Sequence, residues 1–466
     1  MGVTQWLAAA GARVTVTDQA GPETLAESIN ALAGFDVTLR FGGHDPADLD
    51  QCDLVVVNPA VNKRTSEFFQ SVVRRGIPWT TEMNLFCERC PAQVVGVTGT
   101  FGKSTTCAML AEALEACRRA GGVSFTNVHL GGNIGRSLLP ELPKIATSDV
   151  VVLEMSNAQL EDLPRINWAP PVAVVTNLYP HHLDRYAGYA VQQSFADYAA
   201  AKLNIVRDPT GTSKVIVGEL HAEAEEMLSR LVPGVAHRFS GGGRVVRVKR
   251  PEPGVDRCSA QQLIVPGQHN QANAACVLTV CRELGLDEVV AGDALRMFKG
   301  LPHRLEHVRT LGGVDYYNDS KSTAPATTVT AIESFNCCTG HLRPIVAIVG
   351  GQLLHRVPGK DVSLLECAKV LRRACRTVIC TAESGPVFAR AMRAAARGDS
   401  AARGDSRLQV GPLIVESRSL AEALNRARAE AKSGDVVLFS PGAPSFDQFA
   451  NFTARGRYFV DWVQGL

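Results

Sequence analysis

The sequence predicts an α/β protein whose domains are built around parallel sheets. Short runs of β-branched residues, such as VVGVTG and VVVLEMS, alternate with longer helical stretches along the chain. This alternation is typical of βαβ units, in which a helix crosses over from one parallel strand to the next. The 466 residues are enough for about two to four domains of roughly 100–200 residues each.

Breaks in this pattern divide the chain into three predicted domains. A proline follows CERC near residue 91 and precedes a new strand, and Gly and Pro interrupt a helix at FKGLPHR near residue 300. We therefore expect a Rossmann-like domain at 1–90, a phosphate-loop ATPase-type domain at 91–301 and a second Rossmann-like domain at 302–466. The first domain is expected to be truncated, because the helix TQWLAAAG precedes the strand ARVTVTD without the usual opening strand and Gly-rich turn.

Composition excludes several classes of protein. A net charge of +2 gives no sign of nucleic-acid binding, and we expect the basic run GGGRVVRVKRPEP at 241–253 to be an exposed hairpin or loop.

Thirteen cysteines without framework spacing indicate the reducing cytoplasm, and CERC at 87–90 is interpreted as structural or incidental. No apolar run reaches the ~20 residues of a membrane span, and no signal peptide is visible. The tandem AARGDSAARGDS at 395–406 is interpreted as a loop insertion.

The clearest motif is VVGVTGTFGKSTT at 94–106. An apolar strand, a glycine-rich turn and a Lys-Ser pair precede a helix, as in phosphate-binding loops, although Val97 occupies the slot of the first glycine. Such a turn points backbone N–H groups inward, and the helix N-terminus favours an anion. Lys103 would reach the terminal phosphates and Ser104 would bind Mg²⁺. The predicted ATP-binding residues here are Gly99, Thr100, Phe101, Gly102, Lys103, Ser104 and Thr105; a turn with nothing bound is the alternative.

Two other predicted strands lead to residues suited to a metal. VVVLEMS brings Glu154 to the end of one strand, and NLYPHHLDRY, which follows another, carries His181 and His182. Ligands bind beyond the carboxyl ends of strands in open α/β sheets, and a carboxylate suits Mg²⁺. Each residue alone is more simply explained as a surface residue. Together with a phosphate loop, they predict a metal–nucleotide site.

The motifs, taken in order, resemble those of the Mur ligases, which extend the peptide of bacterial cell-wall precursors. The resemblance covers nearly the whole chain, through GVTGTFGKSTT, GGNIG, EMSNAQLE, NLYPHHLDRY, YAAAKLNIV, GQHNQANAA, LPHRLEHV, YNDSKSTAPATT and SPGAPSFDQFANFTARG. NDSKSTAPATT and SFDQFANF resemble the branch of the family that adds D-glutamate to UDP-N-acetylmuramoyl-L-alanine.

This resemblance implies an ATP- and Mg²⁺-dependent ligase of peptidoglycan precursor synthesis, cytoplasmic and monomeric. ATP would phosphorylate the alanyl carboxylate of UDP-N-acetylmuramoyl-L-alanine, and the amine of D-glutamate would then displace the phosphate. Such chemistry depends on positioning and on neutralising phosphate charge more than on a protein nucleophile.

The resemblance also assigns roles to individual residues. The catalytic residues would be Lys103, Glu154, His182 and Lys202, and the metal ligands Ser104, Glu154, His182 and Lys202, the last as a carbamate. Beyond the phosphate loop, ATP would contact Asn270, His303, Arg304, Asp319 and Lys321. The substrates would contact Asp18 near the uridine, Asn133 near the muramoyl-alanine end, and Thr323, Ser445, Phe446 and Phe452 at D-glutamate. A solvated helix lysine is the alternative for Lys202.

Two positions in this site depart from the family pattern. Phe101 replaces the Asn usual before Gly-Lys-Ser, and an apolar ring there loses a hydrogen bond worth about 1 kcal/mol. Leu354 stands near the slot of a lysine that binds a D-glutamate carboxylate, so His355, Arg356 or Lys360 has to substitute. Arg356 would do so well, because a guanidinium binds a carboxylate through two parallel hydrogen bonds.

Two alternatives to this ligase stay open. A folylpolyglutamate synthase would share the ATP motifs but not the NDSKSTAPATT and SFDQFANF pair. A non-catalytic nucleotide-binding relative would explain the short start, Phe101 and Leu354. The second alternative is opposed by the presence of Lys103, Glu154 and Lys202, which a decayed enzyme has no reason to keep.

Overall fold

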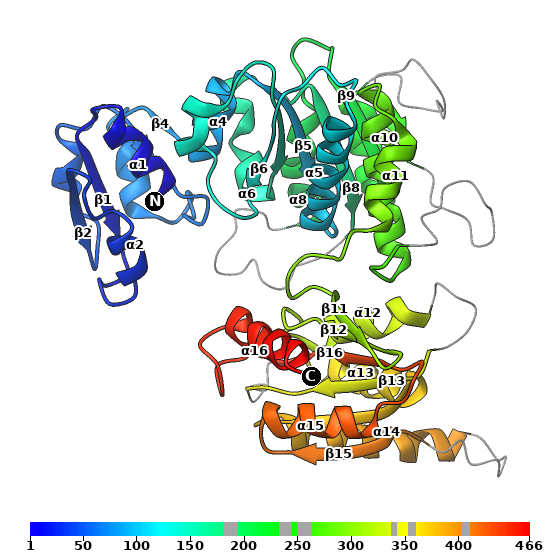
Figure 1. Ribbon diagram of the computed structural model, residues 1–466. Helices are drawn as coiled ribbons and strands as arrows, with labels where there is room; N and C mark the ends of the chain where they lie inside the picture. The colour runs from blue at the N-terminus through cyan, green and yellow to red at the C-terminus, as the bar shows by residue number, and fades with distance from the viewer. Residues whose placement is uncertain (180–193, 233–244, 249–262, 337–342, 353–359, 403–410) are drawn as a thin grey trace. The chain divides into compact units, whose positions relative to one another are not determined.

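The computed structural model describes residues 1–179, 194–232, 245–248, 263–336, 343–352, 360–402 and 411–466 (Figure 1). The chain forms two compact units. The first comprises Met1–Val255 and Ala272–Leu295, and the second Asp256–Gln271 and Arg296–Leu466. The division into domains at 1–90, 91–301 and 302–466 stays a prediction.

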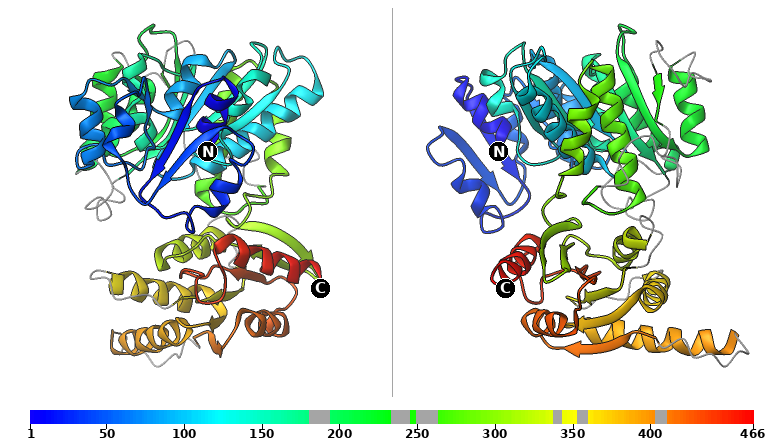
Figure 2. Two further views of the ribbon diagram at one scale, coloured as in Figure 1. Left: turned by 90° about the vertical axis from the view of Figure 1, so that its left-hand side faces the viewer. Right: turned by 45° about the vertical axis from the view of Figure 1, so that its right-hand side comes forward.

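The N-terminal part of the first unit holds two short parallel strand pairs, the first of which is drawn in blue in Figure 2. Its elements are α1 (Gly2–Ala9), β1 (Val14–Asp18), α2 (Ala26–Asn30), β2 (Val37–Phe41), η1 (Pro46–Leu49), β3 (Val55–Val56), α3 (Glu67–Arg74), β4 (Trp79–Thr80) and α4 (Glu82–Arg89). β1 pairs with β2 and β3 with β4. The expected helix-then-strand opening is confirmed. β3 has only two residues, because the chain turns at Asn58, whose Oδ1 accepts the N–H of Ala60.

A six-stranded sheet forms the core of the first unit. Its strands are β5 (Gln93–Thr98), β6 (Val128–Gly132), β7 (Val150–Glu154), β8 (Val172–Leu178), β9 (Lys214–Leu220) and β10 (Val245–Arg247), in the order β10-β9-β8-β5-β7-β6. Its helices are α5 (Lys103–Ala120), η2 (Leu139–Lys144), α6 (Asn157–Glu161), η3 (Leu163–Ile166), α8 (Phe195–Leu203), η4 (Asn204–Val206), α9 (Ala222–Leu231), α10 (Gln268–Glu283) and α11 (Glu288–Arg296). Neighbouring strands all run parallel, as predicted.

The three middle strands of this sheet are buried almost throughout. Every residue of β7 is buried, as are all of β5 except its first residue and all of β8 except Asn177. Near-continuous apolar runs of this kind are typical of parallel strands covered on both faces. Because the strands are parallel, the ends of β5, β7 and β8 meet at one edge of the sheet, where ligands bind in such folds.

The basic run at 241–253 was expected to be a hairpin or loop, and this is wrong for residues 245–247. Val245 pairs with Val215, so β10 is a parallel edge strand beside β9. Val245 is buried at this edge, while Arg247 turns to α9 and its Nη1 donates to Glu225 at 2.7 Å. Val245 and Arg247 are two positions apart, so they lie on the same face of this edge strand.

The second unit contains a mixed six-stranded sheet, whereas a purely parallel one was expected. Its strands are β11 (Glu306–Leu311), β12 (Val314–Asn318), β13 (Ile345–Val349), β14 (Cys375–Thr381), β15 (Leu413–Ser417) and β16 (Val436–Phe439), in the order β11-β12-β16-β13-β14-β15. β11 and β12 form an antiparallel hairpin, and the other pairs are parallel. The hairpin turns at Gly312-Gly313, a pair suited to a two-residue turn.

Helices cover both faces of this second sheet. They are α12 (Pro325–Asn336), α13 (Lys360–Ala374), α14 (Gly385–Ala402), α15 (Leu420–Glu430) and α16 (Phe452–Gln464). Ile345, Ala347 and Val349 pack with α12, α13 and α14, whereas Val346 and Ile348 pack with α15 and α16. This alternation along β13 gives the sheet two apolar faces and one helical layer on each.

The tandem RGDS sequence was expected to lie in a loop, and this is wrong for its first copy. Helix α14 extends through residues 395–402, and the second copy lies outside the described residues. Alanine has the highest helix propensity, and the stretch before the repeat is rich in it.

The cysteines of CERC and the lengths of the helices complete the description of the fold. Cys87 in α4 and Cys90 at its end are free thiols. Among the described residues, no helix has the length and apolar character needed to span a bilayer.

Candidate active site

The phosphate loop joins β5 to α5 in the way its sequence predicts. Gly102 has φ 78° and precedes the first residue of the helix. A Cβ at Gly99 would lie 2.0 Å from Thr176 Oγ1, and one at Gly102 would lie 2.3 Å from Asn273 Oδ1. Both positions therefore require glycine. Ser104 and Thr105 stand in the first turn of α5, half-buried at the end where an anion is favoured.

Lys103 folds back over the loop. Its Nζ donates to the carbonyl oxygens of Gly99 and Thr100, at 3.0 and 3.1 Å. The ammonium group is thereby held above the loop rather than extended into water. This position suits the terminal phosphates of a nucleotide.

Glu154 ends β7 as a buried carboxylate that is only half satisfied. Its Oε1 accepts from Asn133 Nδ2 at 2.9 Å, and its backbone carbonyl accepts the N–H of Asn133 at 2.8 Å. Among the described residues, Oε2 is buried and has no hydrogen-bond partner. Such an oxygen is costly to bury unless it meets a cation, and an oxygen ligand suits Mg²⁺. The geometry at Glu154 therefore fits the metal that the motifs predict.

Lys202 lies in α8 and is 1% exposed. Its Nζ is 3.4 Å from Thr98 Oγ1 and 5.0 Å from the centre of the Tyr198 ring. Burial and the nearby charge of Lys103 lower the pKa of Lys202 well below its usual value, although Glu154 opposes them. A lowered pKa favours the neutral amine. The alternative of a solvated surface lysine is therefore wrong.

The predicted residues of the first unit fall into separate groups. The structure brings Lys103, Glu154, Lys202 and Asn133 together at the carboxyl edge of the six-stranded sheet. Asp18 lies instead at the end of β1, exposed, with Oδ1 accepting the N–H of Ala20. His181 and His182 lie outside the described residues.

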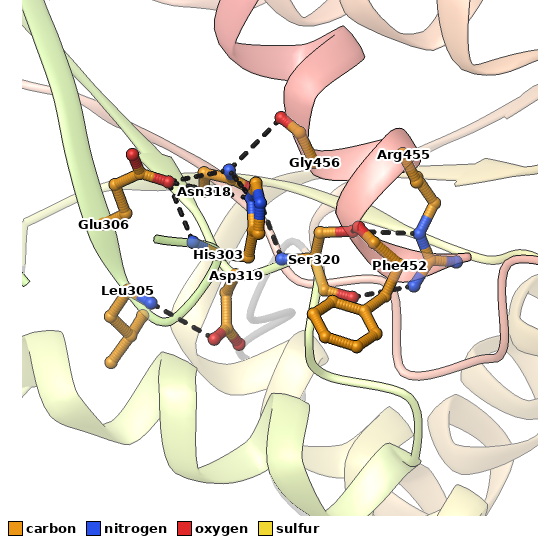
Figure 3. Close-up of polar contacts among 9 residues, drawn as sticks. All are labelled: His303, Leu305, Glu306, Asn318, Asp319, Ser320, Phe452, Arg455 and Gly456. Carbon is orange, nitrogen blue, oxygen red and sulfur yellow. Dashed lines mark hydrogen bonds and ion pairs between the residues drawn. The ribbon is translucent and has the colours of Figure 1, made fainter. Parts of the chain in front are cut away.

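In the second unit, His303 and Asp319 make two separate sets of hydrogen bonds, which Figure 3 shows. His303 has φ 65°, an unfavourable backbone for a residue other than glycine. Its N–H donates to Glu306 Oε2 at 2.8 Å, and Asn318 Nδ2 donates to its Nδ1 at 2.9 Å. The proton of the neutral ring therefore lies on Nε2, and burial lowers the pKa of His303.

Asp319 is the second buried carboxylate of the predicted site. Oδ1 accepts the N–H of Leu305 at 3.2 Å, and Oδ2 accepts the hydroxyl of Ser440 at 2.8 Å. Burial raises its pKa to about 7, against the opposing effects of Ser440, Leu305 and Arg304. Asp319 therefore titrates near neutrality in the absence of a ligand.

The remaining predicted residues of the second unit differ in exposure. Lys321 donates its N–H to the carbonyl oxygen of His303 at 3.1 Å, and its Nζ is 5.1 Å from the centre of the Phe452 ring. Ser445 is buried, whereas Thr323 is exposed and Phe446 is 67% exposed. Asn270 is buried, and its Nδ2 donates to the carbonyl oxygen of Pro266 at 2.7 Å.

The loop that would bind D-glutamate is only partly described. Leu354, His355 and Arg356 lie outside the described residues, and the side chain of Lys360 is not described either. The assignment of Arg356 to the D-glutamate carboxylate thus stays a prediction.

Sequence reasoning missed Arg455, which organises this part of the second unit (Figure 3). It is 3% exposed and donates to Ser320 Oγ, to the Ser320 carbonyl and to the carbonyls of Ala443 and Pro444, at 2.9–3.1 Å. Ser320 Oγ in turn donates to the carbonyl of Phe452 at 2.8 Å. A signal was present: Arg455 shares the buried stripe of α16 with Phe459 and Val463, at a spacing of four.

Comparison with known proteins identifies the family. The Mur ligase middle domain matches residues 97–281, and the Mur ligase glutamate ligase domain matches residues 303–442. The UDP-N-acetylmuramoylalanine–D-glutamate ligase of Symbiobacterium thermophilum is 33% identical over 478 residues, which cover 100% of this chain and 96% of its own. The enzyme of the same name from Pelotomaculum thermopropionicum is 31% identical over 480 residues, with coverages of 100% and 95%.

Solved structures share the fold at lower identity. The UDP-N-acetylmuramate-alanine ligase of Thermotoga maritima has a TM-score of 0.53 at 18% identity, covering 97% of this chain and 99% of its own. The Mycobacterium tuberculosis folylpolyglutamate synthase complexed with ADP scores 0.51 at 16% identity, with coverages of 81% and 93%. These likenesses confirm the predicted α/β fold class. The family models and the relatives above 30% identity show more: the chain belongs to the Mur ligase family.

Proposed function

We propose that this protein is an ATP-dependent ligase that joins D-glutamate to the alanyl carboxyl group of UDP-N-acetylmuramoyl-L-alanine in peptidoglycan precursor synthesis. One observation carries the reaction class. At the carboxyl edge of the first unit's sheet, a phosphate loop lies beside the half-satisfied carboxylate of Glu154 and the buried amine of Lys202. The choice of D-glutamate is supported by the relatives of that name.

In the proposed reaction, an oxygen of the alanyl carboxylate attacks the γ-phosphorus of ATP, and ADP leaves. The amine of D-glutamate then attacks the acyl carbon, loses a proton, and phosphate leaves as the amide forms. Loop N–H groups and Lys103 bind the phosphates, so that charge is balanced while the two substrates are held in position. Asn270, His303, Arg304, Asp319 and Lys321 complete the ATP site in this proposal, and Thr323, Arg356, Ser445, Phe446 and Phe452 receive D-glutamate.

Mg²⁺, when bound, would neutralise part of the phosphate charge. Ser104, Glu154, His182 and Lys202 would hold it. The lone buried oxygen of Glu154 supports this assignment. The lowered pKa of Lys202 supports its carbamylation, because only a neutral amine adds carbon dioxide, releasing a proton and gaining a carboxylate-like group. We also propose that the protein acts as a monomer in the cytoplasm.

Phosphate release tests the proposal directly. The purified chain is given ATP, Mg²⁺ and UDP-N-acetylmuramoyl-L-alanine, with D-glutamate, with L-glutamate or with neither. We expect release that depends on D-glutamate, together with a product heavier by one glutamyl residue in mass spectrometry. ATP binding without release under any of these conditions would instead support a non-catalytic nucleotide-binding relative.

A further inference from the structure

The tip of the phosphate loop is held by Asn177, a residue of β8 to which none of the roles above is assigned. The N–H of Phe101 donates to Asn177 Oδ1 at 2.9 Å, and Asn177 Nδ2 donates to the carbonyl oxygen of Phe101 at 3.0 Å. One side-chain amide thus binds both backbone polar groups of a single loop residue. The backbone of Asn177 adds a third bond, because its carbonyl accepts the N–H of Thr100 at 2.9 Å.

Thr176, the preceding residue, also binds the phosphate loop. It is 5% exposed, and its Oγ1 lies 2.8 Å from the carbonyl oxygen of Phe101 and 3.3 Å from that of Thr98. The absence of a side chain at Gly99 leaves just enough room for this hydroxyl. The end of β8 and the phosphate loop are therefore in close contact.

These contacts explain how the loop tolerates Phe101. Three of them use the backbone of residue 101 and none uses its side chain, which is 48% exposed. The loss expected from replacing Asn by Phe is therefore not a loss of the bonds that hold the loop. The amide that fixes the loop comes from residue 177 instead.

We propose that Asn177, assisted by Thr176, is a positioning residue for nucleotide binding, fixing the direction in which the loop presents its N–H groups to the phosphates. Preorganised donors bind phosphate without first having to be ordered. Loosening them should weaken the nucleotide and leave the other substrates little affected. This inference rests on the proposed function only for the identity of the nucleotide.

The test compares Asn177→Ala with Asn127→Ala. Asn127 is the control: its Nδ2 also makes a hydrogen bond, to Asp149 Oδ1 at 3.0 Å, but it precedes β6 and so lies at the amino ends of the strands. Calorimetry measures Mg·ADP binding, and steady-state kinetics give KM for ATP and for UDP-N-acetylmuramoyl-L-alanine. We expect Asn177→Ala to weaken ADP binding and raise KM for ATP about tenfold or more, since two hydrogen bonds are lost. Its KM for the UDP substrate, and ADP binding by Asn127→Ala, should change less than about twofold, because neither involves the loop bonds.

A second pair keeps the test decisive if Asn177→Ala does not fold. Thr176→Val removes the hydroxyl at nearly constant shape, and Thr176→Ser retains it, so weakened ADP binding in the first and recovery in the second would support the proposal. Equal weakening by the residue 177 and residue 127 substitutions, or parallel rises in both KM values, would overturn it in favour of a merely structural role. If the wild type binds ADP but does not ligate D-glutamate, the proposed function fails while the role of Asn177 is still decided by the ADP data.

Discussion

Asn133 donates to one carboxylate oxygen of Glu154 at 2.9 Å and leaves the other oxygen buried without a partner among the described residues. The amide therefore fixes the orientation of the carboxylate while one oxygen stays available. An oriented carboxylate of this kind is what a metal ligand needs, since the partners of ligands set their direction.

This relationship predicts the effect of Asn133→Ala. Glu154 would lose its orienting donor, so we expect the Mg²⁺ concentration for half-maximal ligation to rise about tenfold or more. Titration of activity with Mg²⁺ measures it, with Asn127→Ala as the control. A rise in KM for the UDP substrate alone, with an unchanged Mg²⁺ requirement, would place Asn133 at the substrate and not behind the metal.

Carbamylation of Lys202 predicts chemical rescue. Lys202→Ala should be slower by orders of magnitude, because a negatively charged oxygen ligand would be missing, and added acetate or propionate should restore part of the rate by occupying the vacated space. Lys214→Ala, an exposed lysine paired with Glu283 in the same unit, serves as the control. Full activity in Lys202→Ala without added carboxylate would contradict the role.

The raised pKa of Asp319 predicts a pH-dependent stability. The folded state holds this proton more tightly than the unfolded state, in which the pKa is about 4. The contribution of Asp319 to the free energy of unfolding should therefore be largest below about pH 4, decline as the pH rises to about 7, and stay constant above that value. Urea unfolding of wild type and Asp319→Asn from pH 5 to 8 tests this prediction. The wild type should lose stability relative to the variant as pH rises, and parallel curves would refute it.

Arg455 predicts coupled losses of stability and D-glutamate affinity. Arg455→Met removes the printed side-chain donors to the buried carbonyls of Ser320 and Ala443, and one of the two donors to the carbonyl of Pro444, so we expect a cost of roughly 3 kcal/mol or more. KM for D-glutamate should rise as well, because Ser320 and the chain before Ser445 lose their common anchor. Thermal unfolding and D-glutamate titration measure the two effects. Arg457→Met, exposed on the same helix, is the control, and equal behaviour of the two variants would refute the role.

Arg356 provides the remaining test of the D-glutamate site. If its guanidinium binds a carboxylate of D-glutamate, Arg356→Ala should raise KM for D-glutamate far more than KM for ATP. Steady-state titration of each substrate separates the two values. Equal effects on both would indicate a folding defect instead.

The parts of the site that could be predicted from sequence are local or lie at strand ends. The phosphate loop is contiguous, and Glu154 ends a strand that its apolar run already marks. Asn177 and Arg455 were missed because their partners are distant in sequence: Asn177 binds a residue 76 positions away, and Arg455 binds one 135 positions away. No spacing rule reveals such a pairing before the sheet is assembled.

The strands, too, divide into those that the sequence predicted and those that it did not. Parallel strands were found wherever an apolar run was uninterrupted, as in β5, β8 and β13. The antiparallel β11–β12 hairpin was missed although Gly312-Gly313 marks its turn, because its strands, EHVRTL and VDYYN, have few aliphatic residues and carry less apolar signal. Strand β10 was missed because it has only three residues and lies within a basic run.

Gly456 is required because it has no side chain. A methyl group there would come 2.2 Å from His303 Nδ1, and its carbonyl accepts from Asn318 at 3.3 Å. A survey of all substitutions would therefore score position 456 as intolerant, as though it touched a ligand. Gly456→Ala would be tolerated only together with a substitution that replaces His303 by a smaller residue. Positions 303 and 456, which are 153 residues apart in the sequence, should therefore vary together.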